Sequence, residues 1–134
     1  MTFLLRTKLY APPTRAELVP RPRLLERLNA GLAEHRKLTL VSAPAGYGKT
    51  TLVAAWLAQQ TDKRLRSAWL SLDAEDNDPA RFAAYLLAAL QGIDASLGQG
   101  LQPLLEMAHL PPLPILLEQL LNELLALETQ GVLV

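Results

Sequence analysis

The most informative stretch of the sequence runs from Leu38 to Leu57 and reads LTLVSAPAGYGKTTLVAAWL. Its centre, APAGYGKT, begins at Ala43 and has the spacing (A/G)-x-x-x-x-G-K-(S/T). Phosphate groups are held by backbone N–H groups that point inward from a loop of small residues. Gly46 and Gly48 allow the backbone to approach a ligand that closely. The spacing therefore predicts a phosphate-binding loop of the Walker A type.

Two side chains of this loop carry the remaining chemistry. Lys49 supplies a cation that can reach the outer phosphates, and the Thr50 hydroxyl can ligate the Mg²⁺ that accompanies them. Thr50 is accordingly the predicted metal ligand. The predicted cofactor-binding residues of the loop are Ala43, Pro44, Ala45, Gly46, Tyr47, Gly48, Lys49, Thr50 and Thr51.

The segments around the loop suit such a site. Leu38–Val41 is short, apolar and partly β-branched, which is typical of a buried parallel strand. Leu52–Ala58 contains strong helix formers, and a helix that begins at the loop directs the positive end of its dipole toward the phosphates. Ser67–Leu72 alternates small or polar with large apolar residues and predicts a second strand. Strand, helix and strand in this order form a βαβ unit with a right-handed crossover.

Ala43 stands where many loops of this type carry glycine. If that position required a positive φ, alanine would cost about 1–2 kcal/mol there, whereas at the end of a strand it fits without strain.

Composition narrows the function class. The chain has 134 residues, half of them apolar, and no cysteine, so disulfides and thiolate metal sites are excluded and a cytoplasmic location is expected. No apolar run is long enough for a membrane span. The zero net charge hides an asymmetry, because residues 1–37, 38–72 and 73–134 carry net charges of +5, +3 and −8. The basic part could face an anionic ligand, but the favoured interpretation is that the two parts complement each other or parts of a longer protein.

The rest of the chain supplies helices and one acidic cluster. The prolines of residues 1–22 predict an irregular segment. Amphipathic patterns predict helices over 23–34, 79–91 and 115–128, with a shorter turn at 104–108. The cluster Asp73–Asp78 follows the second predicted strand, where carboxylates could hold a metal, but Asn77 or Asp78 as a helix cap before Pro79 is the favoured interpretation.

The last part of the chain predicts the end of a helix and the beginning of a strand. Gln130-Gly131 is expected to close the helix over 115–128, and Val132–Val134 to open a third strand. The leucine stripe of that helix, which could bind a partner, is interpreted as core. It consists of Leu116, Leu117, Leu120, Leu121, Leu124 and Leu127. His35 and His109 have no ligand partner at usable spacing and are not interpreted as catalytic.

Three segments together resemble a known family. LVPRPRLLERL, KLTLVSAPAGYGKTTLVAAWL and AWLSLDAEDNDPARFAAYLLAALQ are similar to the nucleotide-binding N-terminus of MalT-like, ATP-dependent LuxR-type transcriptional regulators, which belong to the STAND class of P-loop NTPases. The similarity covers nearly all of residues 4–91. It implies an α/β fold, the three-layer P-loop NTPase sandwich with a parallel sheet, here incomplete and ending at the start of the Walker B strand. The implied organisation is an irregular segment, 1–22, that joins the nucleotide site, and the N-terminal part of the NTPase domain, 23–134.

The resemblance also implies partners and a role. ATP and Mg²⁺ are the expected ligands, with Arg21 near the nucleotide. The other expected partners are the remainder of a longer parent chain, DNA through its C-terminal helix-turn-helix, and further copies of the parent through ATP-dependent self-association. The leading hypothesis is an ATP-binding switch module with no turnover of its own. The alternatives are a small P-loop ATPase or kinase, for which Asp73–Asp78 holds the candidate acids, and an α/β piece without a ligand.

Overall fold

The computed structural model describes residues 3–107, 110–128 and 130–134, so His109 lies outside the described residues. The chain divides into two compact units. The sheet unit comprises Met1–Tyr10 and Asp62–Val134, and the loop unit comprises Ala11–Thr61. The two units differ in how many apolar side chains they bury. Among the described residues, no helix is long and apolar enough to cross a membrane.

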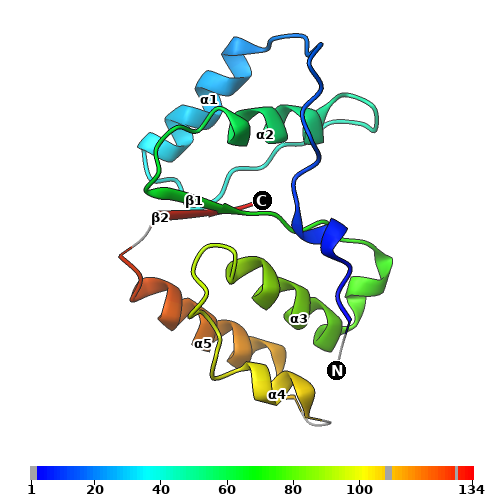
Figure 1. The fold of residues 1–134 in the computed structure, drawn as a ribbon, viewed down its shortest axis with the longest axis vertical. Coiled ribbons are helices and arrows are strands. Elements are labelled where there is room, and N and C mark those ends of the chain that lie inside the picture. The colour runs from blue at the N-terminus through cyan, green and yellow to red at the C-terminus, as the bar shows by residue number, and fades with distance from the viewer. Residues whose placement is uncertain (1–2, 108–109, 129) are drawn as a thin grey trace. The chain divides into compact units, whose positions relative to one another are not determined.

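The sheet unit contains a short parallel sheet (Figure 1). Strand β1 (Leu65–Ala68) pairs with β2 (Gln130–Leu133), with Leu65 opposite Gln130 and Ala68 opposite Leu133. Past the last paired residues, Leu70 N donates to Val134 O at 2.7 Å and Val134 N donates to Ala68 O at 2.9 Å. The expected third strand over 132–134 is therefore confirmed as a parallel neighbour of the second.

Three helices cover one side of this sheet (Figure 1). They are α3 (Pro79–Leu90), α4 (Gln102–Glu106) and α5 (Leu113–Leu125). Their leucines and alanines enclose a core with Ala68 of β1. Full burial of one leucine side chain contributes about 1.5–3 kcal/mol, so this apolar cluster is the main source of stability in the unit. Its buried members are Ala68, Ala83, Leu87, Ala89, Leu90, Ile93, Leu97, Leu101, Leu116 and Leu120.

Several of the expected boundaries in this unit need correction. Strand β1 begins at Leu65 instead of Ser67, and α5 begins at Leu113 instead of Ile115. Strand β1 ends at Ala68 instead of Leu72, because beyond it only Leu70 makes a ladder bond to Val134. Helix α5 ends at Leu125, and Gln130-Gly131 lies in β2 instead of closing that helix. The turn expected over 104–108 is α4, and its last predicted residue lies outside the described residues.

The leucine stripe of α5 is core for the most part. Leu116 and Leu120 are buried, and Leu124 and Leu127 pack against the same cluster. The other two members differ, since Leu121 is 58% exposed and Leu117 is half-buried without belonging to this cluster.

The loop unit consists of two helices and irregular chain. Helix α1 (Pro22–Ala33) packs on α2 (Lys49–Ala58), and Trp56 Nε1 of α2 donates to Asn29 Oδ1 of α1 at 2.7 Å. Helix α1 is closed by His35, which adopts a left-handed φ of 54° while its N–H donates to Leu32 O. His35 thus terminates a helix.

The strand expected at Leu38–Val41 does not form. Leu38 and Leu40 are 85% and 84% exposed. A strand requires a neighbour that accepts and donates ladder hydrogen bonds. Residues 11–61, all of which are described, contain no strand that could serve as one. The expected βαβ unit and three-layer sandwich are therefore not observed, and the fold is mixed α/β with a two-stranded parallel sheet.

Candidate phosphate-binding site

The loop before α2 has the local geometry that its glycines predict. Gly46 and Gly48 adopt φ values of 84° and 78°, which only glycine enters at little cost. Gly48 is the N-cap residue of α2, and its carbonyl accepts the N–H of Leu52 at 2.9 Å. The loop therefore opens directly into a helix, so unpaired N–H groups and the positive end of the helix dipole lie at the loop.

Alanine at position 43 is not strained. Among the described residues, His35 is the one non-glycine residue with a positive φ. Ala43 thus adopts an ordinary backbone conformation, which resolves the question that its replacement of glycine raised.

Two cations bond to the backbone of this loop. Lys49 Nζ donates to the carbonyls of Ala43 at 2.5 Å and Pro44 at 3.1 Å. Arg21 Nη1 donates to the carbonyl of Tyr47 at 3.2 Å. Both positive charges therefore lie beside the segment that is expected to bind phosphate, although Arg21 precedes the loop by more than twenty residues.

Arg21 reaches the loop because of its neighbours in sequence. It is the N-cap residue of α1 and lies between Pro20 and Pro22, which fix the backbone on either side. Its Nη2 lies 3.7 Å from the position that a Cβ on Gly48 would occupy. The structure thus brings Arg21 and the loop together.

A cavity of about 970 Å³ lies next to the loop within the loop unit. Sites for small molecules usually measure about 300–1,000 Å³, so the cavity is large enough for a nucleotide. Four of the predicted residues line it, namely Arg21, Gly48, Thr50 and Thr51. The other predicted positions, from Ala43 to Tyr47 and Lys49, are not among its lining residues.

Much of the cavity wall was not predicted. One side is the proline-rich segment from Pro12 to Pro20, and the other is the face of α2 that carries Ala54, Ala55 and Gln59. The sequence indicates that the first segment is stiff, but stiffness alone does not reveal what a segment faces. Apolar residues lie on all sides of α2, so its sequence does not indicate which side lines the cavity.

The acidic cluster at Asp73–Asp78 serves as helix caps and ion-pair partners. Asp78 Oδ2 accepts the N–H of Arg81 at 2.8 Å and caps α3, which confirms the favoured interpretation. Asp73 caps the short 3₁₀ helix η2 (Ala74–Asn77). The described residues contain no group of three or more His, Cys, Asp or Glu side chains that could hold a metal ion.

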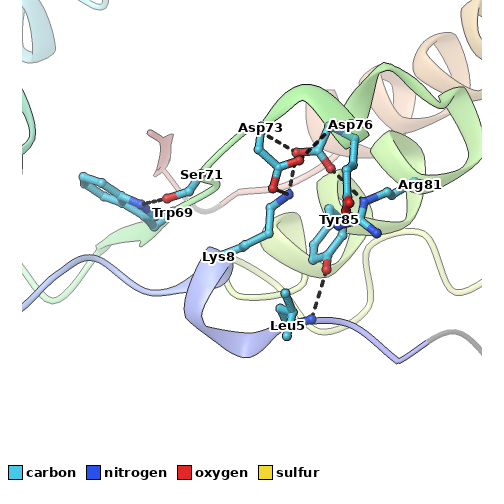
Figure 2. A network of polar contacts seen from close by, with 9 residues as sticks. Leu5, Lys8, Trp69, Ser71, Asp73, Asp76, Arg81 and Tyr85 are labelled. Carbon is cyan, nitrogen blue, oxygen red and sulfur yellow. Dashed lines mark hydrogen bonds and ion pairs between the residues drawn. The ribbon is translucent and has the colours of Figure 1, made fainter. Parts of the chain in front are cut away.

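Asp73 and Asp76 instead bind Lys8 (Figure 2). The hydrogen bond from Lys8 lowers the pKa of both carboxyl groups below the ordinary aspartate value, and backbone N–H donors lower each further. Burial lowers the pKa of Lys8, but hydrogen bonds from its ammonium to Asp76 and Asp73 and the charges of these carboxylates outweigh that effect, so the pKa is raised. All three groups are therefore charged at neutral pH.

Known proteins resemble the chain over 89 residues, or 66% of its length. It is 51% identical to the HTH-type transcriptional regulator MalT of Yersinia enterocolitica and 53% identical to that of Serratia proteamaculans. The MalT regulator of Cronobacter sakazakii is 45% identical over the same length. The matched residues span 9% of each relative. No protein-family model matches the chain. The chain is thus homologous to a part of transcriptional regulators named MalT.

Proposed function

We propose that this MalT-like chain is the ATP-binding switch module of a transcriptional regulator. In this proposal Gly46–Thr51 bind the phosphates through backbone N–H groups, Lys49 and Arg21 supply positive charge, and Thr50 ligates Mg²⁺. The observation that carries the proposal is the glycine loop that opens α2 with both cations bonded to it. The cavity beside the loop has room for the rest of a nucleotide.

In this proposal, phosphate oxygens replace backbone carbonyls as the hydrogen-bond acceptors of Lys49 and Arg21. The ammonium of Lys49 now binds two neutral carbonyls, and charged phosphate oxygens are stronger acceptors for it. The same holds for Arg21 at the Tyr47 carbonyl. The exposed hydroxyls of Thr50 and Thr51 at the first turn of α2 are free to meet a ligand.

A switch requires that ATP bind one form of the regulator better than another. Binding to one form alone shifts the population toward it by mass action. Control of transcription then belongs to the whole regulator, as do DNA binding, self-association in the presence of ATP and a cytoplasmic location. The relatives' name, HTH-type transcriptional regulator, supports this assignment.

The proposal is tested by titration of Mg²⁺-ATP against the wild-type chain and Lys49→Ala. We expect the variant to bind about ten- to a hundredfold more weakly, because a hydrogen bond to a charged group contributes about 1.5–3 kcal/mol. The matched control is Lys37→Ala, which removes an exposed lysine of the same unit. Equal affinity of wild type and Lys49→Ala, or no binding by the wild type, would refute the proposed site.

A P-loop ATPase or kinase is the alternative function. The contacts of the acidic cluster favour the switch over this enzyme. Asp73 and Asp76 bind Lys8 and cap η2, so neither is a free base. We expect no significant release of phosphate from ATP. Release that Asp73→Asn abolishes would favour the enzyme instead.

The other alternative is a role without a ligand. It predicts that Mg²⁺-ATP leaves the melting temperature of the chain unchanged, whereas binding raises it.

A further inference from the structure

The N-terminal arm, residues Phe3–Leu9, lies on a corner of the sheet unit formed by the end of β1, η2 and α3 (Figure 2). It contains the 3₁₀ helix η1 (Arg6–Leu9). Two backbone groups fasten it. The N–H of Ser71, beyond the end of β1, donates to Lys8 O at 2.8 Å, and the N–H of Leu5 donates to the hydroxyl of Tyr85 at 3.0 Å.

Lys8 makes the strongest contacts of the arm. Its Nζ lies 3.0 Å from Asp73 Oδ2 and 2.5 Å from Asp76 Oδ2, and 4.4 Å from the centre of the Tyr85 ring. The lysine is only 7% exposed, and the side chain of Asp76 only 4%. A buried ammonium is tolerated because carboxylates and an aromatic face surround it.

Apolar burial contributes little to the docking of the arm. Phe3 and Leu5 are 88% and 61% exposed. Leu9 packs partly against the core cluster and is the main apolar anchor. The arm is therefore held chiefly by the Lys8 ion pairs and two backbone hydrogen bonds, whereas the helices behind it are held by buried leucines.

We propose that the N-terminal arm is a strap that opens and closes as one piece without unfolding of the sheet unit, and that Lys8 is the latch that keeps it closed. Segments with few apolar contacts open at lower free energy than a leucine core. Loss of the ammonium leaves Asp76 charged and buried without its main partner, which favours the open strap.

Amide hydrogen exchange measured by NMR on the 134-residue chain tests the strap, because adjacent residues report different events. The N–H of Ser71 donates to Lys8 O in the arm, and the N–H of Leu5 in the arm donates to the Tyr85 hydroxyl. The N–H of Leu70 instead donates to Val134 O in the sheet. In Lys8→Met we expect Ser71 and Leu5 to exchange about tenfold faster or more, with Leu70 unchanged. Lys8→Arg keeps the charge and should retain slow exchange.

The matched control is Arg6→Met, which removes an exposed cation from the same 3₁₀ turn. It should leave all three amides at wild-type rates. Unchanged exchange of Ser71 in Lys8→Met would overturn the proposal. Equal acceleration of Leu70 and Ser71 would also overturn it, because the arm would then open only together with the sheet.

The wild-type chain provides a second measurement if Lys8→Met does not fold. Exchange is followed at increasing, non-denaturing concentrations of urea. Opening of a small strap exposes little surface, so Ser71 and Leu5 should exchange at rates that depend little on urea. Leu70 should exchange faster as urea rises. The same urea dependence for Ser71 and Leu70 would overturn the proposal.

Discussion

The two units of this chain stabilise themselves in different ways. Of the fourteen buried hydrophobic residues among those described, twelve lie in the sheet unit, and the loop unit contributes only Ala54 and Trp56. Charge differs as well. The loop unit carries seven basic and three acidic side chains, a net charge of +4, and the sheet unit six and ten, a net charge of −4. One unit is thus built around an apolar core, and the other exposes a glycine loop with cations beside it.

The difference indicates which unit is suited to bind a ligand and which unit supplies stability. A loop with positive φ values and exposed hydroxyls buries little apolar surface, so it cannot supply much stability of its own. The leucine core has the opposite property, because its buried and closely packed side chains contribute most of the stability of the sheet unit. Substitutions in the core of the sheet unit should therefore mainly change the free energy of unfolding. Substitutions in the glycine loop should also change the affinity for the ligand.

The largest loss of stability is expected in the sheet unit. Leu120→Ala removes a 4% exposed side chain from the core and should reduce the free energy of unfolding by about 2–5 kcal/mol. The control is Leu125→Ala on the same helix, which is 83% exposed and should change stability by less than about 0.5 kcal/mol. Urea unfolding followed by circular dichroism measures both. Similar losses would contradict the assignment of Leu120 to the core.

A smaller loss is expected at the contact that joins α1 to α2 in the loop unit. Asn29→Ala leaves the buried indole N–H of Trp56 without its acceptor, at a cost of about 1–3 kcal/mol. Gln60→Ala removes the weaker donor to the same oxygen, at 3.3 Å, and should have little effect. Tryptophan fluorescence during urea unfolding, measured in a Trp69→Phe background so that Trp56 is the emitting residue, reports the change. If Gln60→Ala destabilised the unit more than Asn29→Ala, the indole contact would not be the main one.

The glycine loop should be sensitive to substitution of Gly48. Gly48→Ala forces a side chain into a φ of 78°, which costs about 1–2 kcal/mol, and should also weaken Mg²⁺-ATP binding by distortion of the first turn of α2. Gly100→Ala is the control, because a Cβ there meets nothing within 4 Å. Calorimetric titration and thermal unfolding measure both effects. Wild-type affinity and stability in Gly48→Ala would argue against a backbone requirement for glycine.

The last prediction concerns how the stability of the sheet unit depends on pH through Asp73 and Asp76. These carboxylates should change stability little around neutral pH and more strongly in acid. The pKa values of Asp73 and Asp76 are lowered in the folded state, so their contribution is fully present above the ordinary aspartate pKa of about 4 and is lost as pH falls through the folded values. Stability should be nearly constant from about pH 6 to 8 and fall below about pH 4. Lys8→Met should make this loss smaller, because the pKa values of Asp73 and Asp76 in the folded state then return toward the ordinary value. An acid loss of the same size in Lys8→Met would contradict the role of Lys8.

Local sequence signals predicted the parts that depend on near neighbours. Pro79 after Asp78 marks the start of α3, and the glycines of the loop take the positive φ values that their spacing suggests. Helix ends were less predictable, since α5 stops three residues before Glu128. Partners distant in sequence were harder still. Nothing local to Lys8 or Asp76 reveals that they form an ion pair across 68 positions.

The sequence by itself determined the phosphate-loop motif, the caps, the apolar faces of the helices and the similarity to MalT regulators, because each depends on spacing along a few residues. Only the tertiary structure decided which extended segments become strands. Val132 pairs with Ser67, whereas Leu38–Val41, with an equally favourable composition, remains unpaired. A strand exists only when a second backbone completes its hydrogen bonds, and that partner is set by the folding of distant segments.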